Sequence, residues 1–237
     1  IHSPSFLPLA VIIGKLFNIP TVLTVRDYYL ICPLGFCLWQ KNRACSLAEF
    51  ISHDIPTYAK SYPSTVLSPL LHFGVRLQSR FLRFFAHQVD QIVCVSQAQR
   101  KIFIANGFKC QVIYNTFDFP KVSRVARKNQ IIFVGRLTPG KGADLLIPTF
   151  HKLRATGYQL LVVGSGFLES KLRQSRIQLT GQLEYQQVLK FYRQVKLAIF
   201  PSRWPEPFGR GALEAIATGI PVVTSNKGGL PEIVQGK

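Results

Sequence analysis

The second half of the chain alternates short apolar stretches with longer amphipathic ones, and this order restricts the possible folds more than any other feature. Several stretches have the length and β-branched content of buried strands: residues 131–134, 158–163, 177–179, 197–200 and 221–224. Stretches of helical length separate them: residues 142–156, 167–176, 185–195 and 209–218. Strands that alternate with helices of this length predict a parallel, doubly wound α/β sheet.

The first half shows the same alternation less regularly. Strands are expected at residues 19–25, 90–96 and 110–115, and helices at 6–17, 66–87 and 97–106.

Residues 117–129 contain Pro120 and spaced Lys and Arg, which is typical of a linker. We expect two Rossmann-like domains, 1–128 with the linker and 129–237. The chain has no Met and begins in what looks like the end of a strand, so we expect the natural chain to be longer at both ends.

Right-handed crossovers place the strand-to-helix loops along one edge of such a sheet. Four loops of the second half fall there: G-R-L-T-P-G-K-G (135–142), G-S-G (164–166), T-G-Q-L (180–183) and W-P-E-P-F-G (204–209). We therefore expect them to line one cleft. The glycines of G-S-G are interpreted as positions of close chain approach rather than as ligands.

Two cations stand in the first of these loops. Arg136 follows Gly135, and Lys141 comes just before a glycine that opens the next helix. Arginine binds phosphate oxygens bidentately, and lysine adds a compact positive charge. The loop is not a Walker motif, but its cations suit a diphosphate.

Two glutamates stand seven residues apart in the last loop and the helix that follows it. Pro205 and Pro207 hold Glu206 in a rigid loop, whereas Glu214 lies more than one turn inside a helix that begins near Gly209. Such a helix start suits an anion. Carboxylates accept hydrogen bonds from hydroxyl groups, so the pair suits a polyol that also carries phosphate. The alternative is two solvated glutamates at the surface.

The same helix has a predicted packing face and a predicted end. Leu213, Ile216 and Ala217 fall on one helical face. Gly219 suits a left-handed stop. The residues after it read as a buried strand.

The segment P-S-R-W-P-E-P-F-G, followed by A-L-E-A-I-A-T-G-I-P-V-V and G-G-L-P-E-I-V, resembles the signature of retaining glycosyltransferases of family 4, which have the GT-B fold. The resemblance implies two facing Rossmann-like domains, a nucleotide-sugar donor in the C-terminal one and an acceptor in the N-terminal one. It implies a hexosyl- or glycosyltransferase with retention of configuration and with no metal or other cofactor. It also implies a front-face mechanism, in which the departing diphosphate helps to take the acceptor proton.

The resemblance also assigns roles to residues. Arg136 and Lys141 hold the donor diphosphate, Glu206 contacts the donor sugar, and Glu214 binds the ribose. Further donor contacts are expected from Gly135, Gly181, Leu183, Phe208 and Gly209, with 181–183 bordering the base. On the acceptor side the resemblance points to Arg26 and Asp27, which follow a predicted strand. The family usually has histidine at the position of Arg26, glutamate at Gly140 and glycine at Thr116.

The net charge of +18 favours anionic partners such as nucleotide diphosphates or acidic lipid surfaces. The basic residues are dispersed and no nucleic-acid docking motif is present, so nucleic acid is not expected as a partner. A saccharide or a lipid-linked molecule is the expected acceptor, within cell envelope polysaccharide synthesis. The open alternatives are a nucleotide-sugar hydrolase or epimerase and an inactive fragment.

The five cysteines indicate a reducing compartment, because an odd number with three in residues 32–45 does not suit a secreted disulfide framework. We therefore expect a cytoplasmic protein. Cys32, Cys37, Cys45 and His53 could hold zinc, or the cysteines could be structural.

The predicted helix at 66–87 combines arginines with aromatic residues. Arg76, Arg80 and Arg83 share one face, and another is apolar, with Phe73, Leu77, Phe81 and Phe84. This pattern suits the surface of an anionic membrane, on its inner face. It also suits a helix that packs within the domain and exposes a solvated basic side.

Overall fold

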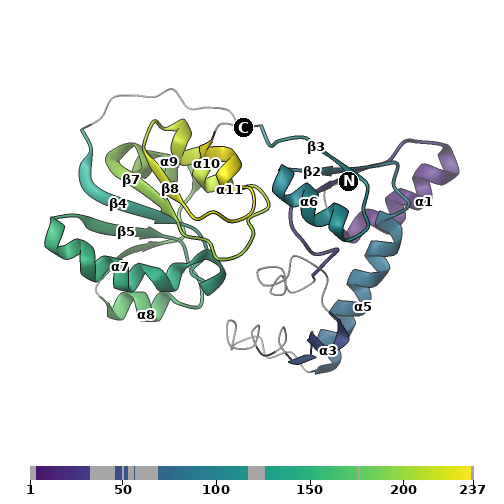
Figure 1. The fold of residues 1–237 in the computed structure, drawn as a ribbon, viewed down its shortest axis with the longest axis horizontal. Coiled ribbons are helices and arrows are strands. Elements are labelled where there is room, and N and C mark those ends of the chain that lie inside the picture. The colour runs from purple at the N-terminus through teal and green to yellow at the C-terminus, as the bar shows by residue number, and fades with distance from the viewer. Residues whose placement is uncertain are drawn as a thin grey trace. The chain divides into compact units, whose positions relative to one another are not determined.

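The computed structural model describes residues 4–32, 46–49, 51–52, 56, 69–116, 126–175 and 177–235. The chain forms two compact units, Ile1–Asn115 and Thr116–Lys237 (Figure 1). The division predicted after residue 128 lies at the beginning of β4 (Lys128–Val134) in the second unit.

The first unit contains a parallel sheet of order β1-β2-β3. Its strands are β1 (Val22–Val25), β2 (Gln91–Cys94) and β3 (Cys110–Val112), and its helical elements are η1 (Pro4–Phe6), α1 (Leu7–Phe17), α3 (Leu47–Glu49), α5 (Pro69–Ala86) and α6 (Gln97–Ala105). The predicted strand 19–25 is shortened at its start. Helix α1 ends at Asn18 in the left-handed conformation, and Pro20, which has no N–H to donate, follows before the sheet pairing begins.

The core of the first unit packs α1, α5 and α6 against the strands. Leu7 and Val11 of α1, Leu82 of α5 and Phe103 of α6 are buried in it. Cys32, Cys94 and Cys110 are buried in this apolar core. Cys37, Cys45 and His53 lie outside the described residues, and the described ones contain no cluster that could hold a metal ion.

The second unit is built on a five-stranded parallel sheet of order β6-β5-β4-β7-β8. Besides β4, its strands are β5 (Gln159–Val163), β6 (Gln178–Gly181), β7 (Val195–Phe200) and β8 (Val222–Thr224). Because β4 is central and the chain winds outward in both directions, the predicted doubly wound sheet is confirmed.

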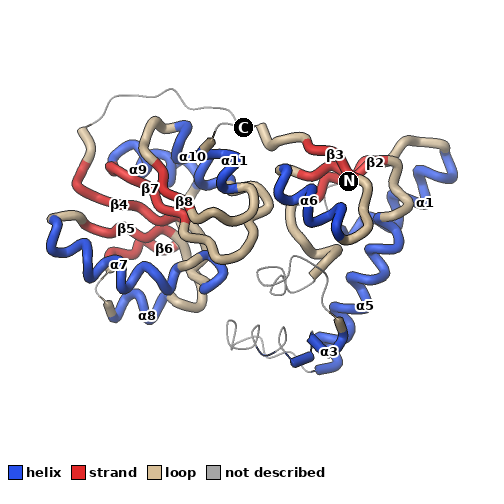
Figure 2. Tube along the Cα trace, in the orientation of Figure 1, coloured by secondary structure: helices blue, strands red, loops and turns tan. Residues whose placement is uncertain are grey.

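Helices cover both faces of this sheet (Figure 2). The helical elements are η4 (Pro139–Lys141), η5 (Ala143–Leu145), α7 (Leu146–Leu153), η6 (Arg154–Thr156), α8 (Glu169–Gln174), α9 (Tyr185–Gln194), α10 (Arg210–Ala217) and α11 (Leu230–Val234). Along β4 the side chains alternate. Phe133 packs with α7 and α8, whereas Ile132 packs with α9, α10 and α11.

Three local predictions for the second unit differ from the structure. The helix expected from Gly142 starts with the 3₁₀ segment η5, which the left-handed Gly142 (φ +73°) separates from η4, and the α-helix begins at Leu146. Of the residues on the face predicted for α10, Ala217 is buried, whereas Ile216 is 36% exposed. The buried residues of α10 are Ala212, Glu214, Ala215 and Ala217.

Strand β8 was predicted to be buried, but it lies at the sheet edge and Val223 is 57% exposed. An apolar stretch of this length gives no information about its place in the sheet.

Among the described residues, no helix combines the length and the apolar content needed to cross a bilayer.

Candidate active site

The loops after β4, β5 and β6 lie against one another at the carboxyl edge of the second sheet. The Leu137 N–H donates to the Ser165 carbonyl (2.9 Å), and the Gly164 N–H donates to the Gly181 carbonyl (2.8 Å). A Cβ on Gly164 would lie 2.0 Å from the Gly135 oxygen, and one on Gly166 would lie 2.8 Å from the Leu137 nitrogen. The predicted role of G-S-G, close approach of chain segments, is confirmed.

The loop after β4 is also joined to the loop after β7. The backbone N–H groups of Arg203 and Trp204 both donate to the Gly140 carbonyl, at 2.9 and 3.2 Å. The Arg203 guanidinium pairs with Asp144 at 2.7 Å. A Cβ on Gly142 would lie 2.1 Å from the Pro201 oxygen, so this position requires glycine. We call residues 135–144 and 201–209 the paired loops, since these contacts hold them as one body.

The paired loops bring Lys141 and Glu206 together. The Lys141 Nζ lies 2.5 Å from Glu206 Oε1 and 5.4 Å from the centre of the Trp204 ring. The Ser202 hydroxyl donates to the same Oε1 at 2.6 Å. Glu206 is only 6% exposed, so these two donors compensate much of the cost of burying its charge. Among the described residues nothing donates to Oε2, which leaves that oxygen for a ligand hydroxyl.

Two consecutive glycines support the backbone of Glu206. The Gly229 N–H donates to the Glu206 carbonyl at 2.8 Å. Gly228 has φ +59°, and a Cβ there would lie 2.2 Å from the Glu206 oxygen and 2.3 Å from its nitrogen. The sequence showed this pair only as a flank of the motif. A double glycine before the Pro of α11 was the available signal for a close approach.

Glu214 lies one turn inside α10 and is 7% exposed. Its Oε1 accepts a hydrogen bond of 3.0 Å from the Nε of Arg210, which stands one turn earlier. Below it, the Tyr192 hydroxyl donates to the Gly211 carbonyl at 3.2 Å. Burial, and to a lesser extent the charge of Glu214, raises the pKa of Tyr192 well above its usual value. Tyr192 therefore remains a neutral hydrogen-bond donor beneath the glutamate.

The other predicted donor residues lie on the same sheet edge with different exposures. Arg136 is exposed just after β4, and the Gly135 N–H donates to the Val163 carbonyl. Gly181 has a positive φ of +76°. Leu183 packs against the α9 and α10 side of the core, and Phe208 is buried. Gly209 is the left-handed N-cap of α10 (φ +98°), as expected for a residue at the helix start.

The predicted acceptor residues belong to the first unit. Arg26 and Asp27 follow β1 directly and are exposed. The Asp27 carboxylate accepts a hydrogen bond of 2.9 Å from the Tyr29 N–H, and its carbonyl accepts one of 3.1 Å from the Gln99 side chain. These contacts fix the turn at the carboxyl end of the strand.

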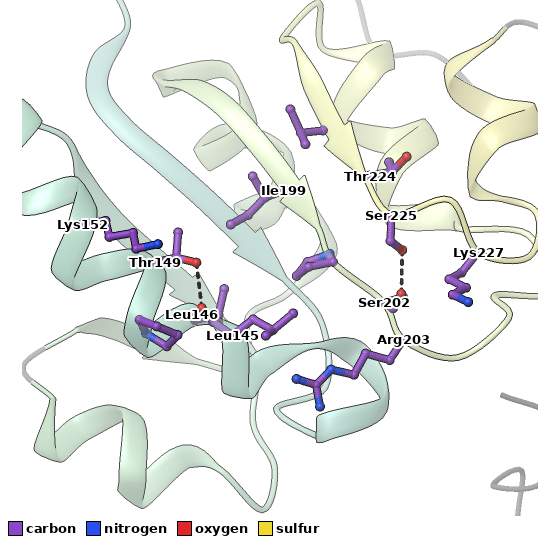
Figure 3. A pocket seen from close by; sticks show the side chains of 13 residues that line it. Leu145, Leu146, Thr149, Lys152, Ile199, Ser202, Arg203, Thr224, Ser225 and Lys227 are labelled. Atoms are coloured by element: carbon purple, nitrogen blue, oxygen red, sulfur yellow. Dashed lines mark hydrogen bonds between the residues drawn. The ribbon is translucent and has the colours of Figure 1, made fainter. Parts of the chain in front are cut away.

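The second unit also contains a hollow of about 810 Å³ that sequence reasoning did not find (Figure 3). It lies between α7 and the ends of β7 and β8, and it shares Ser202 and Arg203 with the paired loops. The Ser225 hydroxyl donates to the Ser202 carbonyl at 2.6 Å on its wall, as the figure shows. The hollow therefore borders the segment that positions Glu206.

A family profile described as glycosyl transferases group 1 matches residues 115–237, which is more than half of the chain. The chain belongs to this family. It is 30% identical to an uncharacterized glycosyltransferase of Methanocaldococcus jannaschii over 171 residues, covering 65% of this chain and 45% of that protein. It is 28% identical over 233 residues to an uncharacterized protein in a cps region of Klebsiella pneumoniae, covering 93% of this chain and 54% of the relative.

Among solved structures, this group 1 chain resembles HepE of Anabaena, determined with UDP and glucose. The TM-score is 0.65 with 21% identity, and the match covers 98% of this chain and 60% of HepE. The predicted GT-B class is thereby confirmed at the level of the fold. The chain spans about half the length of the curated relatives that it matches first.

Proposed function

We propose that this chain is part of a retaining glycosyltransferase of family 4, which transfers a sugar from a nucleotide-sugar donor to an acceptor hydroxyl. The observation that carries the proposal is the contact between Lys141 and Glu206 in the paired loops. It places a cation suited to phosphate beside a buried carboxylate with one oxygen left for a hydroxyl. The presence of UDP and glucose in HepE supports a nucleotide-sugar donor.

The proposed donor contacts follow from chemistry and exposure. Arg136 and Lys141 bind the diphosphate, and the free oxygen of Glu206 accepts from the hydroxyl groups of the transferred sugar. Glu214 accepts from the ribose hydroxyls. Gly181 and Leu183 border the base, while Gly135, Phe208 and Gly209 contribute through the shape of their backbone.

In the proposed reaction the acceptor oxygen attacks the anomeric carbon on the face from which the diphosphate leaves. The bond between the anomeric carbon and the phosphate oxygen breaks, a new carbon–oxygen bond forms, and the acceptor proton passes to the departing diphosphate. Negative charge grows on the leaving group, so fixed cations at Arg136 and Lys141 lower the barrier. We expect the reaction to need no metal.

The proposed acceptor is a saccharide or a lipid-linked molecule, bound through Arg26 and Asp27 of the first unit. The relative in a cps region supports a place in cell envelope polysaccharide synthesis. The charge of +18 supports a site of action at an anionic surface, and we propose the inner face of the membrane.

The test is a thermal-shift screen of nucleotide sugars on the protein, followed by analysis of the product formed from the sugar that stabilises it. Retention of the anomeric configuration in a new glycoside supports the proposal. Release of free sugar alone, or a changed sugar on the same nucleotide, would show a hydrolase or an epimerase instead. Binding without turnover in the presence of a broad acceptor set would show an inactive relative.

A further inference from the structure

Helix α5 of the first unit presents an apolar stripe to solvent. Its buried side consists of Ser79, Leu82 and Ala86. Four large side chains elsewhere on the helix are each between 53% and 63% exposed: Phe73, Leu77, Phe81 and Phe84. Their spacing of four, four and three residues aligns them on one face, opposite to the buried side. We call these four residues the α5 stripe.

The packing of the first unit does not account for the α5 stripe. None of its four residues belongs to the core cluster, although α5 itself packs against α1 (Figure 1). Single exposed apolar residues are ordinary, whereas several aligned on one helix mark an interaction surface. As one of the two interpretations from the sequence expects, α5 packs within the domain through Leu82 and Ala86 and exposes Arg80, but its apolar stripe faces solvent.

Arginines of α5 flank the stripe. Arg80 is exposed at its border, and Arg76 and Arg83 follow on the same flank. The Arg76 guanidinium donates to the Ser46 carbonyl at 3.1 Å, and that of Arg83 donates to the Asn106 carbonyl. These bonds hold both side chains along the flank of α5, and Arg80 is the exposed arginine beside the stripe. Neither α5 nor the neighbouring α1 contains an Asp or Glu.

We infer that α5 docks on the surface of a bilayer that contains anionic lipid. The aromatic and leucine side chains of the α5 stripe insert at the level of the head groups, and Arg80 contacts lipid phosphates. Large apolar side chains beside a basic flank, on a helix without carboxylates, match this environment. The net charge of +18 strengthens the attraction to such a surface.

This inference concerns the first unit only, and it does not depend on the proposed transfer reaction. It names one binding partner for the α5 stripe, the surface of a bilayer that contains acidic lipid. Acidic lipid complements the basic flank of α5 and offers an apolar layer for the stripe. If the transfer reaction is also correct, the bilayer holds the unit that carries Arg26 and Asp27.

The experiment measures co-sedimentation of the full chain with vesicles, without any donor. One set of vesicles is phosphatidylcholine alone and the other contains about one part in three of phosphatidylglycerol. The double variant Leu77→Ser, Phe81→Ser should bind the anionic vesicles at least about tenfold more weakly than the parent protein. Arg80→Glu should weaken binding by about fivefold, with most of the loss at low salt.

Matched controls lie on α6 of the same unit. Ile104→Ser removes another exposed apolar side chain, and Lys101→Glu reverses an exposed charge. Both control variants should bind as the parent does. The inference is overturned if the parent ignores anionic vesicles at low salt or if the α5 variants bind as well as the controls. It is also overturned if the parent self-associates through the stripe, shown by a dimer that Leu77→Ser, Phe81→Ser dissociates.

Discussion

The Lys141 ammonium and the Glu206 carboxylate lie 2.5 Å apart, although 65 residues separate them in the chain. The two backbone hydrogen bonds to the Gly140 carbonyl and the pair between Arg203 and Asp144 bring their loops together. In the proposed reaction these two side chains bind different parts of the donor. Because the two side chains are in contact, we expect a change at Lys141 also to affect Glu206.

The first prediction concerns the two cations. Arg136→Ala and Lys141→Ala should each lower turnover at least about a hundredfold, because each removes a fixed positive charge from the leaving group. Nucleoside diphosphate affinity, measured by calorimetry, should fall in both. Unchanged affinity in both variants would show that the diphosphate binds elsewhere.

A double-mutant cycle then tests the coupling. Because Lys141 also neutralises Glu206, the effects of Lys141→Ala and Glu206→Ala on kcat should fall short of additivity by about 1–3 kcal/mol. Arg136→Ala with Glu206→Ala is the matched control, and we expect that pair to be nearly additive. Additive effects in both cycles would contradict a functional role for the contact.

The second prediction concerns Ser202, which is buried and donates 2.6 Å to the same carboxylate oxygen as Lys141. Ser202→Ala should lower kcat by about tenfold with little change in donor KM, because the carboxylate loses one of the two groups that orient it. Ser170→Ala on the exposed side of α8 is the control and should have no effect. A change in KM alone would assign Ser202 to binding rather than to orientation.

The third prediction concerns the support beneath Glu206. Gly228→Ala should destabilise the protein by about 3 kcal/mol, because the new Cβ meets the Glu206 backbone and φ is positive. Gly157→Ala is the matched control. It has a similar φ of +74° but nothing within 4 Å of the added Cβ, so only the backbone strain of about 1 kcal/mol remains. The measurement is the free energy of unfolding of both variants in denaturant. An equal loss of free energy in the two variants would contradict a tight contact at Gly228.

The fourth prediction concerns pH. The His87 ring stacks on Phe108 at 4.4 Å, and burial, followed by the nearby Arg83, lowers the pKa of His87 below its usual value. The unfolded chain therefore binds this proton more readily. The stability contributed by neutral His87 is complete above about pH 6.5 and is lost as the pH falls below it. His87→Phe keeps the stacking and should make unfolding less sensitive to pH between about 7.5 and 5.5. An unchanged pH dependence would contradict this assignment.

The order of strands and helices was predictable because hydrophobic periodicity and loop glycines are local signals. The position of the loops that carry Arg136, Lys141 and Glu206 at one sheet edge followed from the topology alone. Contacts between distant segments were not predictable. The double glycine at Gly228 signals a close approach but does not identify Glu206 as the residue approached. Likewise, nothing in a short apolar strand shows that β8 lies at an edge.

Helix α10 illustrates a different limit. Its apolar residues are compatible with more than one buried face. Close packing against strand β7 determines which face is buried. A Cβ on Gly211 would lie 3.0 Å from the Phe200 ring, so small residues such as Ala212 and Ala215 face the sheet and Ile216 turns outward. The buried face also contains Glu214, a charged residue that a hydrophobic pattern cannot identify as buried.

The last prediction separates the roles of Glu206 and Glu214. Glu206 is held by Lys141 and Ser202 in a loop, whereas Glu214 is held by Arg210 on a helix. In the proposed reaction positive charge develops on the transferred sugar, so hydrogen bonds from its hydroxyls to Glu206 strengthen in the transition state. Glu206→Ala should therefore mainly lower kcat.

Glu214 is proposed to bind the ribose, which does not react, so Glu214→Ala should mainly raise the donor KM. Loss of a charge-assisted contact costs about 1.5–3 kcal/mol, which corresponds to a rise in KM of about tenfold to a hundredfold. Arg210→Ala is the control for an indirect effect, since it removes the cation beside Glu214 and keeps the carboxylate. The measurement is kcat and KM of the three variants, with the nucleotide sugar that stabilises the protein in the thermal-shift screen as donor. The same kinetic signature in both glutamate variants would contradict the assignment of sugar to one and ribose to the other.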